Sequence, residues 1–459
     1  MFTFFDHDNR GSRRSFLRFG ASAAAGLGLT PAGKLAGASG ESLLKGRSVI
    51  FLFLHGGPSQ IETFDPKMDR PEGIRSATGS VKTKLPGIDF GGSFPLLAGV
   101  ADKFTVVRSF RTGDGNHDIK PIVGRDSFGA NLGSIYSRVA GTTHPETGIP
   151  SNVLLFPQSV DPSTQPGQMG FGRFASTGPL NPGFAPFDPA GAGGDLKQLT
   201  VNVPRERLES RRLISSEFDR IKNSLDHLSG VDQMRDQAFR LLAGGLEEAF
   251  DISRESPRLV DRYDTAPLVR PETISKKWNN HKNYADNAKT LGRLLLLARR
   301  LCERGAGFVT VTTNFVWDMH ADVNNATMTE GMGYMGGPLD FALSALVEDL
   351  EIRGLSDKVM VVACGEMGRT PRINAKGGRD HWGGLAPLFI YGGGTKKGQV
   401  IGRSGRDAGE PADIPIGNKE LIASILERTI DVSQMRVIES LPSEISQLMT
   451  SWKPIPGLV

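Results

Sequence analysis

The feature that most constrains the fold of this chain is a series of short, continuous apolar runs that alternate with helical patterns. Helical patterns cover Asp286–Arg304, Leu339–Ile352 after Pro338, and Lys419–Leu426. Continuous apolar strands are typical of parallel sheets with helices on both faces. The sequence therefore predicts an α/β fold with a mostly parallel sheet. Six runs are expected to be its strands: Arg47–Leu54, Phe104–Val107, Val153–Phe156, Phe308–Thr312, Val359–Cys364 and Pro387–Tyr391.

Two segments interrupt this alternation. Residues 158–199 are rich in Gly, Pro, Ser and Ala, and we expect a long surface loop or lid there. Residues 205–250 are charged and have a helical pattern without a strand, which predicts a helical insertion over the sheet. The length of 459 residues allows one large α/β domain with insertions, or two domains. We expect one domain over residues 39–459.

The N-terminus has the pattern of a twin-arginine export signal. In "SRRSFLRFGASAAAGLGL", Arg13 and Arg14 precede an Ala/Gly-rich apolar run that is too short to span a bilayer. The small residues "AGA" at 36–38 fit a cleavage site, so residues 1–38 are expected to be a signal peptide. The expected partner is the twin-arginine translocase. The mature chain should then be periplasmic or extracellular, without a transmembrane segment.

Charge and cysteine content exclude some classes of partner and scaffold. The net charge is +4, and five Lys/Arg against two Asp/Glu in residues 1–38 account for +3 of it, which leaves +1. No basic stripe remains to suggest nucleic-acid binding. The two cysteines, Cys302 and Cys364, resemble small buried apolar residues, and the sequence leaves open whether they pair.

The first apolar run ends in "HGGPSQ", at His55. One interpretation is the oxyanion loop of an α/β-hydrolase, whose backbone amides stabilise a developing alkoxide. That fold also needs a G-x-S-x-G elbow, and the closest matches, around Ser93 and Ser404, lack the final glycine. A serine hydrolase is therefore disfavoured but stays open. The other interpretations are a solvated glycine turn, or the rim of a metal-site cleft with His55 as a ligand.

Potential metal ligands follow several of the predicted strands. Because ligands bind outside the carboxyl ends of strands in α/β sheets, we expect these side chains to converge. Imidazole and carboxylate together suit zinc, manganese or iron, and two such metals would clamp a displacement at phosphorus or sulfur. Arg369 could bind the equatorial oxygens of the phosphate or sulfate group during that displacement, or it could pair with Asp380 as a structural bridge. The alternative for each motif is a solvated loop. The motifs are "GDGNHD" with His117, "WDMH" with Asp318 and His320, "CGEMGR" with Glu366 and Arg369, and "GGRDHWGG" with Asp380 and His381.

Several of these motifs resemble, in order, an exported bacterial family, the domain-of-unknown-function 1501 family. The segments "GGPSQIETFDPK", "LLLARRLCERGAGFVTV", "WDMH", "VEDLEIRGL" and "GEMGRTPRI…GRDHW" carry the resemblance, which covers nearly the whole chain. That family looks similar to the alkaline phosphatase and sulfatase superfamily. The resemblance implies an alkaline-phosphatase-like fold. It also implies metal ligands at Asp318, His320, Glu366 and His381.

Two departures from the superfamily pattern keep two functions open. The first strand ends on His55, where the superfamily has Asp. The place of the nucleophile falls in "NHDIKPIVG", which offers no Ser, Thr or Cys. The leading expectation is an exported metal-dependent hydrolase of phosphate or sulfate esters, with a small anionic ester as substrate. The alternative is a non-catalytic binding or assembly protein on the same fold.

The expected cofactor is a divalent metal, and the sequence does not choose among zinc, manganese and calcium. The expected metal ligands are His55, Asp318, His320, Glu366, Asp380 and His381, and the expected catalytic residues are His117 and Arg369.

Overall fold

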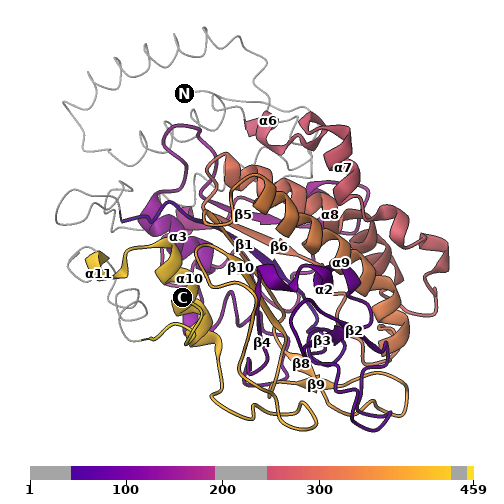
Figure 1. Cartoon of the computed structure of the whole chain (residues 1–459). Coiled ribbons are helices and arrows are strands. Elements are labelled where there is room, and N and C mark those ends of the chain that lie inside the picture. The colour runs from indigo at the N-terminus through magenta and orange to yellow at the C-terminus, as the bar shows by residue number, and fades with distance from the viewer. Residues whose placement is uncertain (1–42, 192–245, 436–451) are drawn as a thin grey trace, which may run out of the picture.

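The computed structural model describes residues 43–191, 246–435 and 452–459 (Figure 1). A seven-stranded sheet lies at its centre, in the order β11-β4-β10-β7-β1-β6-β5. All six predicted strands are present, each within one residue of its expected start and end. The edge strand β11 was not predicted. The strands are β1 (Ser48–Phe53), β4 (Thr105–Val107), β5 (Asn152–Leu155), β6 (Phe308–Thr312), β7 (Val359–Cys364), β10 (Leu388–Gly392) and β11 (Gln399–Ile401).

The sheet is parallel except at one strand. β1 pairs in parallel with both β6 and β7, while β10 runs antiparallel between β7 and β4. In this register Leu388, at the start of β10, lies opposite Cys364, at the end of β7. The segment that enters β10 therefore lies at the same edge of the sheet as the carboxyl ends of the parallel strands.

Helices cover both faces of the sheet, as predicted. Along β1, Ile50 and Leu52 belong to one apolar core and Phe51 and Phe53 to the other, which is the alternation expected of a strand buried on both sides. The first core packs against α8 (His281–Glu303) and α9 (Met328–Ile352), and the second against α3 (Leu132–Ala140) and α10 (Asn418–Thr429). The two helix pairs flank the strands in Figure 1.

The predicted start of α9 was wrong. The helix begins at Met328 and continues through Pro338, where the sequence had suggested a start. Its true beginning is set by Thr327, whose Oγ1 accepts the backbone N–H of Glu330 at 3.2 Å and donates to that residue's carboxylate at 2.9 Å. This side-chain cap satisfies a helix N-terminus that no apolar periodicity reveals.

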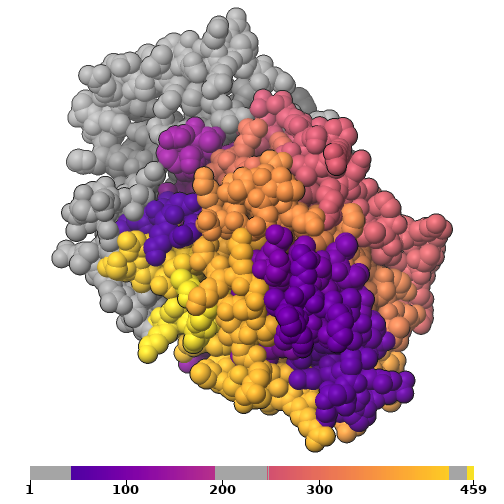
Figure 2. Space-filling model, in the orientation of Figure 1, coloured from indigo at the N-terminus to yellow at the C-terminus, as the bar shows by residue number. Residues whose placement is uncertain are grey.

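Shorter elements complete the described chain. In Figure 2 the indigo residues that follow β1 form a compact patch beside the orange residues of α9. There, Asp340 of α9 accepts the backbone N–H groups of Leu96 and Leu97. The short strands are β2 (Ser80–Lys82), β3 (Asp89–Gly91), β8 (Gly368–Arg369) and β9 (His381–Trp382); the short helices are α2 (Pro95–Gly99), α6 (Leu246–Phe250), α7 (Pro257–Tyr263) and α11 (Val432–Met435).

Some predicted segments fall wholly or partly outside the described residues. The signal peptide lies outside them, as do residues 192–199 of the Gly/Pro-rich loop and most of the helical insertion. Residues 158–191 are irregular apart from short 3₁₀ turns. Cys302 and Cys364 are both buried and free, in the cores on opposite faces of the sheet. No helix among the described residues combines the length and apolar character that crossing a membrane requires.

Candidate metal centre

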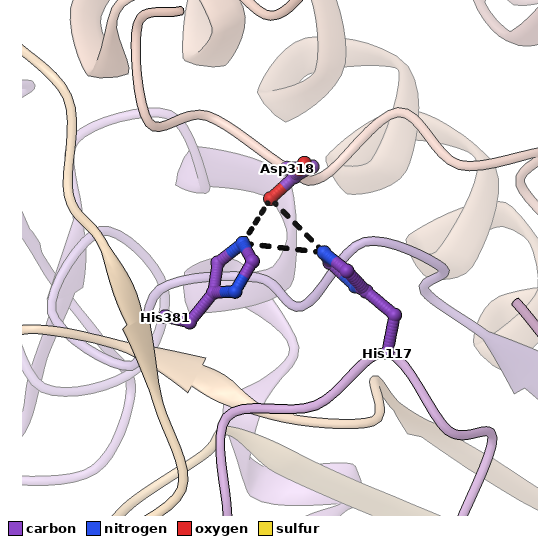
Figure 3. Close-up of side chains that lie close together, drawn as sticks. All are labelled: His117, Asp318 and His381. Atoms are coloured by element: carbon purple, nitrogen blue, oxygen red, sulfur yellow. Dashed lines mark hydrogen bonds and ion pairs between the residues drawn. The ribbon is translucent and has the colours of Figure 1, made fainter.

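Three side chains converge at the carboxyl edge of the sheet. His117 follows β4, Asp318 follows β6, and His381 lies in β9, just before the antiparallel β10. Figure 3 shows their polar atoms pointing toward one another. The Nε2 atom of His381 lies 3.1 Å from Oδ1 of Asp318 and 3.2 Å from Nε2 of His117, and the remaining side of the triangle is 3.6 Å. These three ligand atoms form a candidate cation site.

The spacing of these atoms suits a metal ion. Zinc bonds to nitrogen and oxygen ligands are about 2.0–2.1 Å long, so tetrahedral ligand atoms lie about 3.3–3.4 Å from one another. The observed separations of 3.1, 3.2 and 3.6 Å bracket this value. The site also faces solvent on one side, since the side chain of His381 is 36% exposed. Three protein ligands with an accessible fourth position are typical of catalytic rather than structural metal sites.

Asp318 is the centre of the polar network. Its Oδ1 also accepts a hydrogen bond from Nη2 of Arg369 at 2.6 Å, and its Oδ2 accepts from His320 and from Nδ2 of Asn325, each at 3.0 Å. Burial alone would raise the pKa of Asp318. The Arg369 charge and the hydrogen bonds from His320 and His381 outweigh this effect and hold the pKa far below its usual range. Asp318 is therefore anionic at any physiological pH.

Glu366 lies behind His117, not in the three-atom cluster. Its Oε1 lies 2.8 Å from Nδ1 of His117, and the carboxylate also accepts the backbone N–H of Gly56 at 2.9 Å. A carboxylate only accepts hydrogen bonds, so Nδ1 of His117 carries the proton and Nε2 presents its lone pair to the cluster. This carboxylate–imidazole arrangement orients many metal-binding histidines. The sequence had offered Glu366 as a ligand and His117 as a catalytic group; in the structure a ring nitrogen of His117 lies in the three-atom cluster, and Glu366 contacts the other ring nitrogen.

His320 and Asp380 lie outside the three-atom cluster. Nε2 of His320 contacts the other oxygen of Asp318, and this hydrogen bond raises the pKa of His320. The carboxylate of Asp380 is exposed and accepts Nδ2 of Asn374 at 2.9 Å. The structure therefore brings His320 to the edge of the site. The Asp380 carboxylate, in contrast, contacts Asn374 and not the three-atom cluster.

His55 is completely buried in an aromatic environment. Its ring lies 4.9–5.6 Å from the rings of Phe53, Phe174 and Phe315, and neither ring nitrogen has a hydrogen-bond partner within the described chain. Burial lowers the pKa of His55 to about 4, so the ring is neutral at physiological pH. His55 lies next to the site, through Phe315 and the backbone of Gly56, and takes no part in its three-atom cluster.

The glycines after His55 hold the strand end close to Asp318. Gly56 has a φ of +108°, and a Cβ there would approach the backbone nitrogen of Asp318 to 2.6 Å. The N–H of Gly56 binds Glu366, and that of Gly57 binds the carbonyl of Leu54 at 3.2 Å. The amides that an oxyanion loop would present are thus already hydrogen-bonded inside the protein.

Arg369 is fully buried, and its donors are used inside the protein. Nε donates to the carbonyl of Gly57 at 2.8 Å, while Nη2 donates to the carbonyl of Gly56 and to Asp318. The sequence had offered Asp380 as the partner of Arg369 in a structural bridge; in the structure Arg369 pairs with Asp318 instead. The guanidinium is therefore positioned to fix the carboxylate and the glycine turn, and not to receive substrate oxygens.

Two asparagines near the site were not identified from the sequence. Asn280, immediately before α8, donates from Nδ2 to Oδ1 of Asn325 at 2.7 Å, and Asn325 donates to Asp318. The signal available in the sequence was the polar loop "DVNN" shortly after Asp318. Asparagines in such loops commonly bond to local backbone, so the pattern does not distinguish a partner of Asp318 from an ordinary turn.

Solved structures that align with most of this chain include three enzymes at low sequence identity. The sulfatase PsFucS1 from Pseudoalteromonas sp. is 14% identical, covers 86% of this chain and 69% of its own, and has a TM-score of 0.35. The phosphonate monoester hydrolase SpPMH from Silicibacter pomeroyi is 11% identical, with coverages of 83% and 73% and a TM-score of 0.31. The lipoteichoic acid synthase LtaP from Listeria monocytogenes is 9% identical, with coverages of 92% and 78% and a TM-score of 0.28.

At these scores, none of the three assigns a substrate to this chain. Comparison of the sequence with curated proteins found no match. The comparison with protein families did find one, and it agrees with the resemblance carried by the strand-end motifs. The match runs from residue 46 to residue 438 and includes every residue of the candidate metal centre. The chain belongs to the family described as protein of unknown function (DUF1501).

Proposed function

We propose that this protein is a metal-dependent hydrolase of phosphate or sulfate esters. The observation that carries the proposal is the spacing of the ligand atoms of His117, Asp318 and His381 at the open edge of the sheet. A divalent metal bound there would polarise an ester oxygen and lower the pKa of a bound water. The two imidazoles and one carboxylate suit zinc or manganese better than calcium, which prefers six or more oxygen ligands.

The protein side chains would have distinct tasks. Glu366 would keep the Nδ1 proton on His117, so that Nε2 stays available as a ligand. Arg369 and Asn325 would hold the Asp318 carboxylate in one orientation. His320 is 21% exposed, and its raised pKa, caused by the hydrogen bond to Asp318, favours a protonated ring that could donate to a leaving oxygen.

Water is the proposed nucleophile. The segment around His117, Asn116 to Asp118, offers neither a hydroxyl nor a thiol. A direct attack by water needs no covalent intermediate, and it agrees with a site whose protein groups are candidate metal ligands and hydrogen-bond donors.

Elemental analysis and an ester panel test the proposal together. Protein purified without chelator and reconstituted with zinc or manganese should carry close to one equivalent of metal. It should also hydrolyse at least one member of a panel of aryl phosphates, phosphodiesters and aryl sulfates. Asp318→Ala and His381→Ala should lose metal and turnover, whereas the matched control Asp380→Ala should retain both. Less than about a tenth of an equivalent of metal after reconstitution would contradict the proposal.

A second candidate function is non-catalytic binding or assembly. The observation that favours it is the complete burial of Arg369, which leaves the site without the cation that the sequence offered for anionic oxygens. This candidate predicts stoichiometric metal in the wild type and no turnover of any ester in the panel. Measured turnover that is lost in Asp318→Ala excludes it.

We further propose that the chain is exported through the twin-arginine translocase to the periplasm or beyond. The support is the sequence of residues 1–38 alone. Replacing both Arg13 and Arg14 by lysine should retain the protein in the cytoplasmic fraction, as judged by cell fractionation. Export that is unchanged in this variant contradicts the proposal.

A further inference from the structure

An exposed aromatic ring lies beside the candidate metal centre. Phe171 stacks on Phe315 with a centroid distance of 4.3 Å and an interplanar angle of 13°. The ring of His117 lies 5.1 Å from Phe171 and 4.8 Å from Phe315. Phe315 is 7% exposed, whereas Phe171 is 43% exposed. The stacked pair therefore presents the ring of Phe171 to solvent directly beside His117, a candidate metal ligand.

The backbone under this pair is strained. Phe315 has a φ of +65°, in the left-handed region that bulky side chains rarely adopt, and the preceding Asn314, a residue type that tolerates this region, has a φ of +54°. Such strain persists only where surrounding contacts impose it, and it concentrates at functional sites. Here the strained residue is the one whose ring contacts both His117 and Phe171.

Specific contacts also fix the loop that carries Phe171. The backbone N–H of Gln168 donates to Oδ1 of Asn314 at 2.6 Å, and Nδ2 of Asn314 donates to the carbonyl of Pro166 at 3.3 Å. A Cβ on Gly172 would lie 2.6 Å from the side chain of Ile119, so the loop packs closely beside the segment of His117. Phe171 is therefore an exposed ring on an anchored loop.

The ring packed against the buried side of Phe315 is a neutral imidazole, that of His55. Phe315 also contacts the buried ring of His55, at 4.9 Å, and Phe174 covers the same imidazole. Burial keeps His55 neutral, so the imidazole packed against Phe315 carries no charge that would attract the anionic group of an ester.

We propose that Phe171, supported by Phe315, binds a ring with an apolar face in the alcohol part of the ester. The inference rests on the proposed hydrolase function and narrows its substrate class to ring-bearing esters, either aryl or pyranosyl. The phosphate or sulfate group would lie at His117, Asp318 and His381, and the ring would stack on the outer face of Phe171. Offset stacking between rings is favoured beyond simple burial.

The kinetic test compares substrates with and without a ring. Phe171→Ala should raise KM for phenyl phosphate about 3- to 10-fold and leave KM for ethyl phosphate within about twofold. Phe171→Tyr keeps the ring and should restore the wild-type KM. Leu268→Ala removes an apolar side chain of nearly the same exposure, 44%, from the 3₁₀ turn Ala266–Leu268 and should change neither KM value. Equal effects of Phe171→Ala on both esters, or no effect on either, would overturn the inference.

A binding measurement separates this inference from the proposed function. If the wild type hydrolyses no ester, the hydrolase proposal fails, and calorimetry with metal-loaded protein still tests the ring subsite. Phenylphosphonate should bind about 3- to 10-fold more tightly than methylphosphonate, and Phe171→Ala should abolish the difference. Equal affinities in the wild type overturn the inference. Glucose 1-phosphate in the same assay distinguishes the sources: weaker binding to Phe171→Ala extends the subsite to pyranosyl esters, and unchanged binding restricts it to aryl esters.

Discussion

Replacing Glu366 by glutamine tests whether the carboxylate behind His117 controls metal affinity. The Oε1 of Glu366 receives both the His117 Nδ1 proton, at 2.8 Å, and the Gly56 N–H, at 2.9 Å. Glutamine has nearly the same shape and keeps one acceptor oxygen, but it removes the charge. Hydrogen bonds to charged groups contribute about 1.5–3 kcal/mol and neutral ones about 0.5–1.5 kcal/mol. The variant should lose about 1 to 1.5 kcal/mol of metal-binding free energy, or roughly tenfold in affinity.

The assay is competition for zinc against a chromophoric chelator, with circular dichroism as a check on folding. Asp318→Asn, which changes a proposed direct ligand, should lose more affinity than Glu366→Gln. Asp380→Asn is the matched control, because the sequence offered Asp380 as a ligand while its carboxylate binds Asn374 at the surface. It should change affinity by less than about twofold. The reasoning is refuted if a folded Glu366→Gln binds zinc like the wild type, or if Asp380→Asn loses as much as Glu366→Gln.

Three further predictions concern stability and positioning. Arg379 and Glu62 form a completely buried ion pair at 2.9 Å, so Arg379→Met should lower the free energy of unfolding by about 3–5 kcal/mol in urea titrations, and the double variant with Glu62→Gln should recover part of the loss. Burial raises the pKa of Asp340 from 3.8 to about 6, so this residue contributes stability that is complete below pH 3.8 and is lost as pH rises through 6. Relative to Asp340→Asn, the wild type should therefore lose about 3 kcal/mol between pH 3.8 and pH 7, and a flat difference between the two proteins would contradict this sign. Asn325→Ala removes one hydrogen-bond donor to Asp318 and should weaken zinc affinity a few-fold. The melting temperature of the metal-free protein should change by no more than about 3 °C. Zinc affinity equal to that of the wild type would show that Asn325 does not position the carboxylate.

The sheet was predictable because its strands are apolar on both faces. Continuous runs such as Phe308–Thr312 leave no solvent-facing pattern, and such runs identify the centre of an α/β sheet. The antiparallel direction of β10 was not predictable, since a strand buried on both faces has the same composition in either direction. Nor did periodicity reveal that α9 begins at Met328, because a hydroxyl cap at Thr327 determines the start.

For the site, the sequence identified the neighbourhood better than the individual roles. His117, Asp318, Glu366 and His381 do meet at one edge of the sheet, as expected for residues near strand ends, whereas His55 and Asp380 lie outside this group. Which of these residues form the cluster (His117, Asp318 and His381) and which supports it (Glu366) depends on where each side chain points, and differences of a few ångströms decide it. Spacing along the chain does not encode these directions. The burial of Arg369 likewise depends on the carbonyls of Gly56 and Gly57, which accept its hydrogen bonds, and no residue type in the sequence predicts this.

The position of β10 between β7 and β4 also determines when the metal centre can be completed during synthesis. In the sheet, β4 pairs with β10 and β11, both of which come late in the chain. His117 and His381 are 264 positions apart, so at ordinary elongation rates His117 emerges roughly 15 to 50 s before its partner. During that interval β4 has no neighbouring strand, and Asp318 has no histidine from β9. Any metal held by all three side chains could therefore bind only after β9 has been synthesised. A chain that stops before β10 would release an early strand without an adjacent one, a species prone to aggregation.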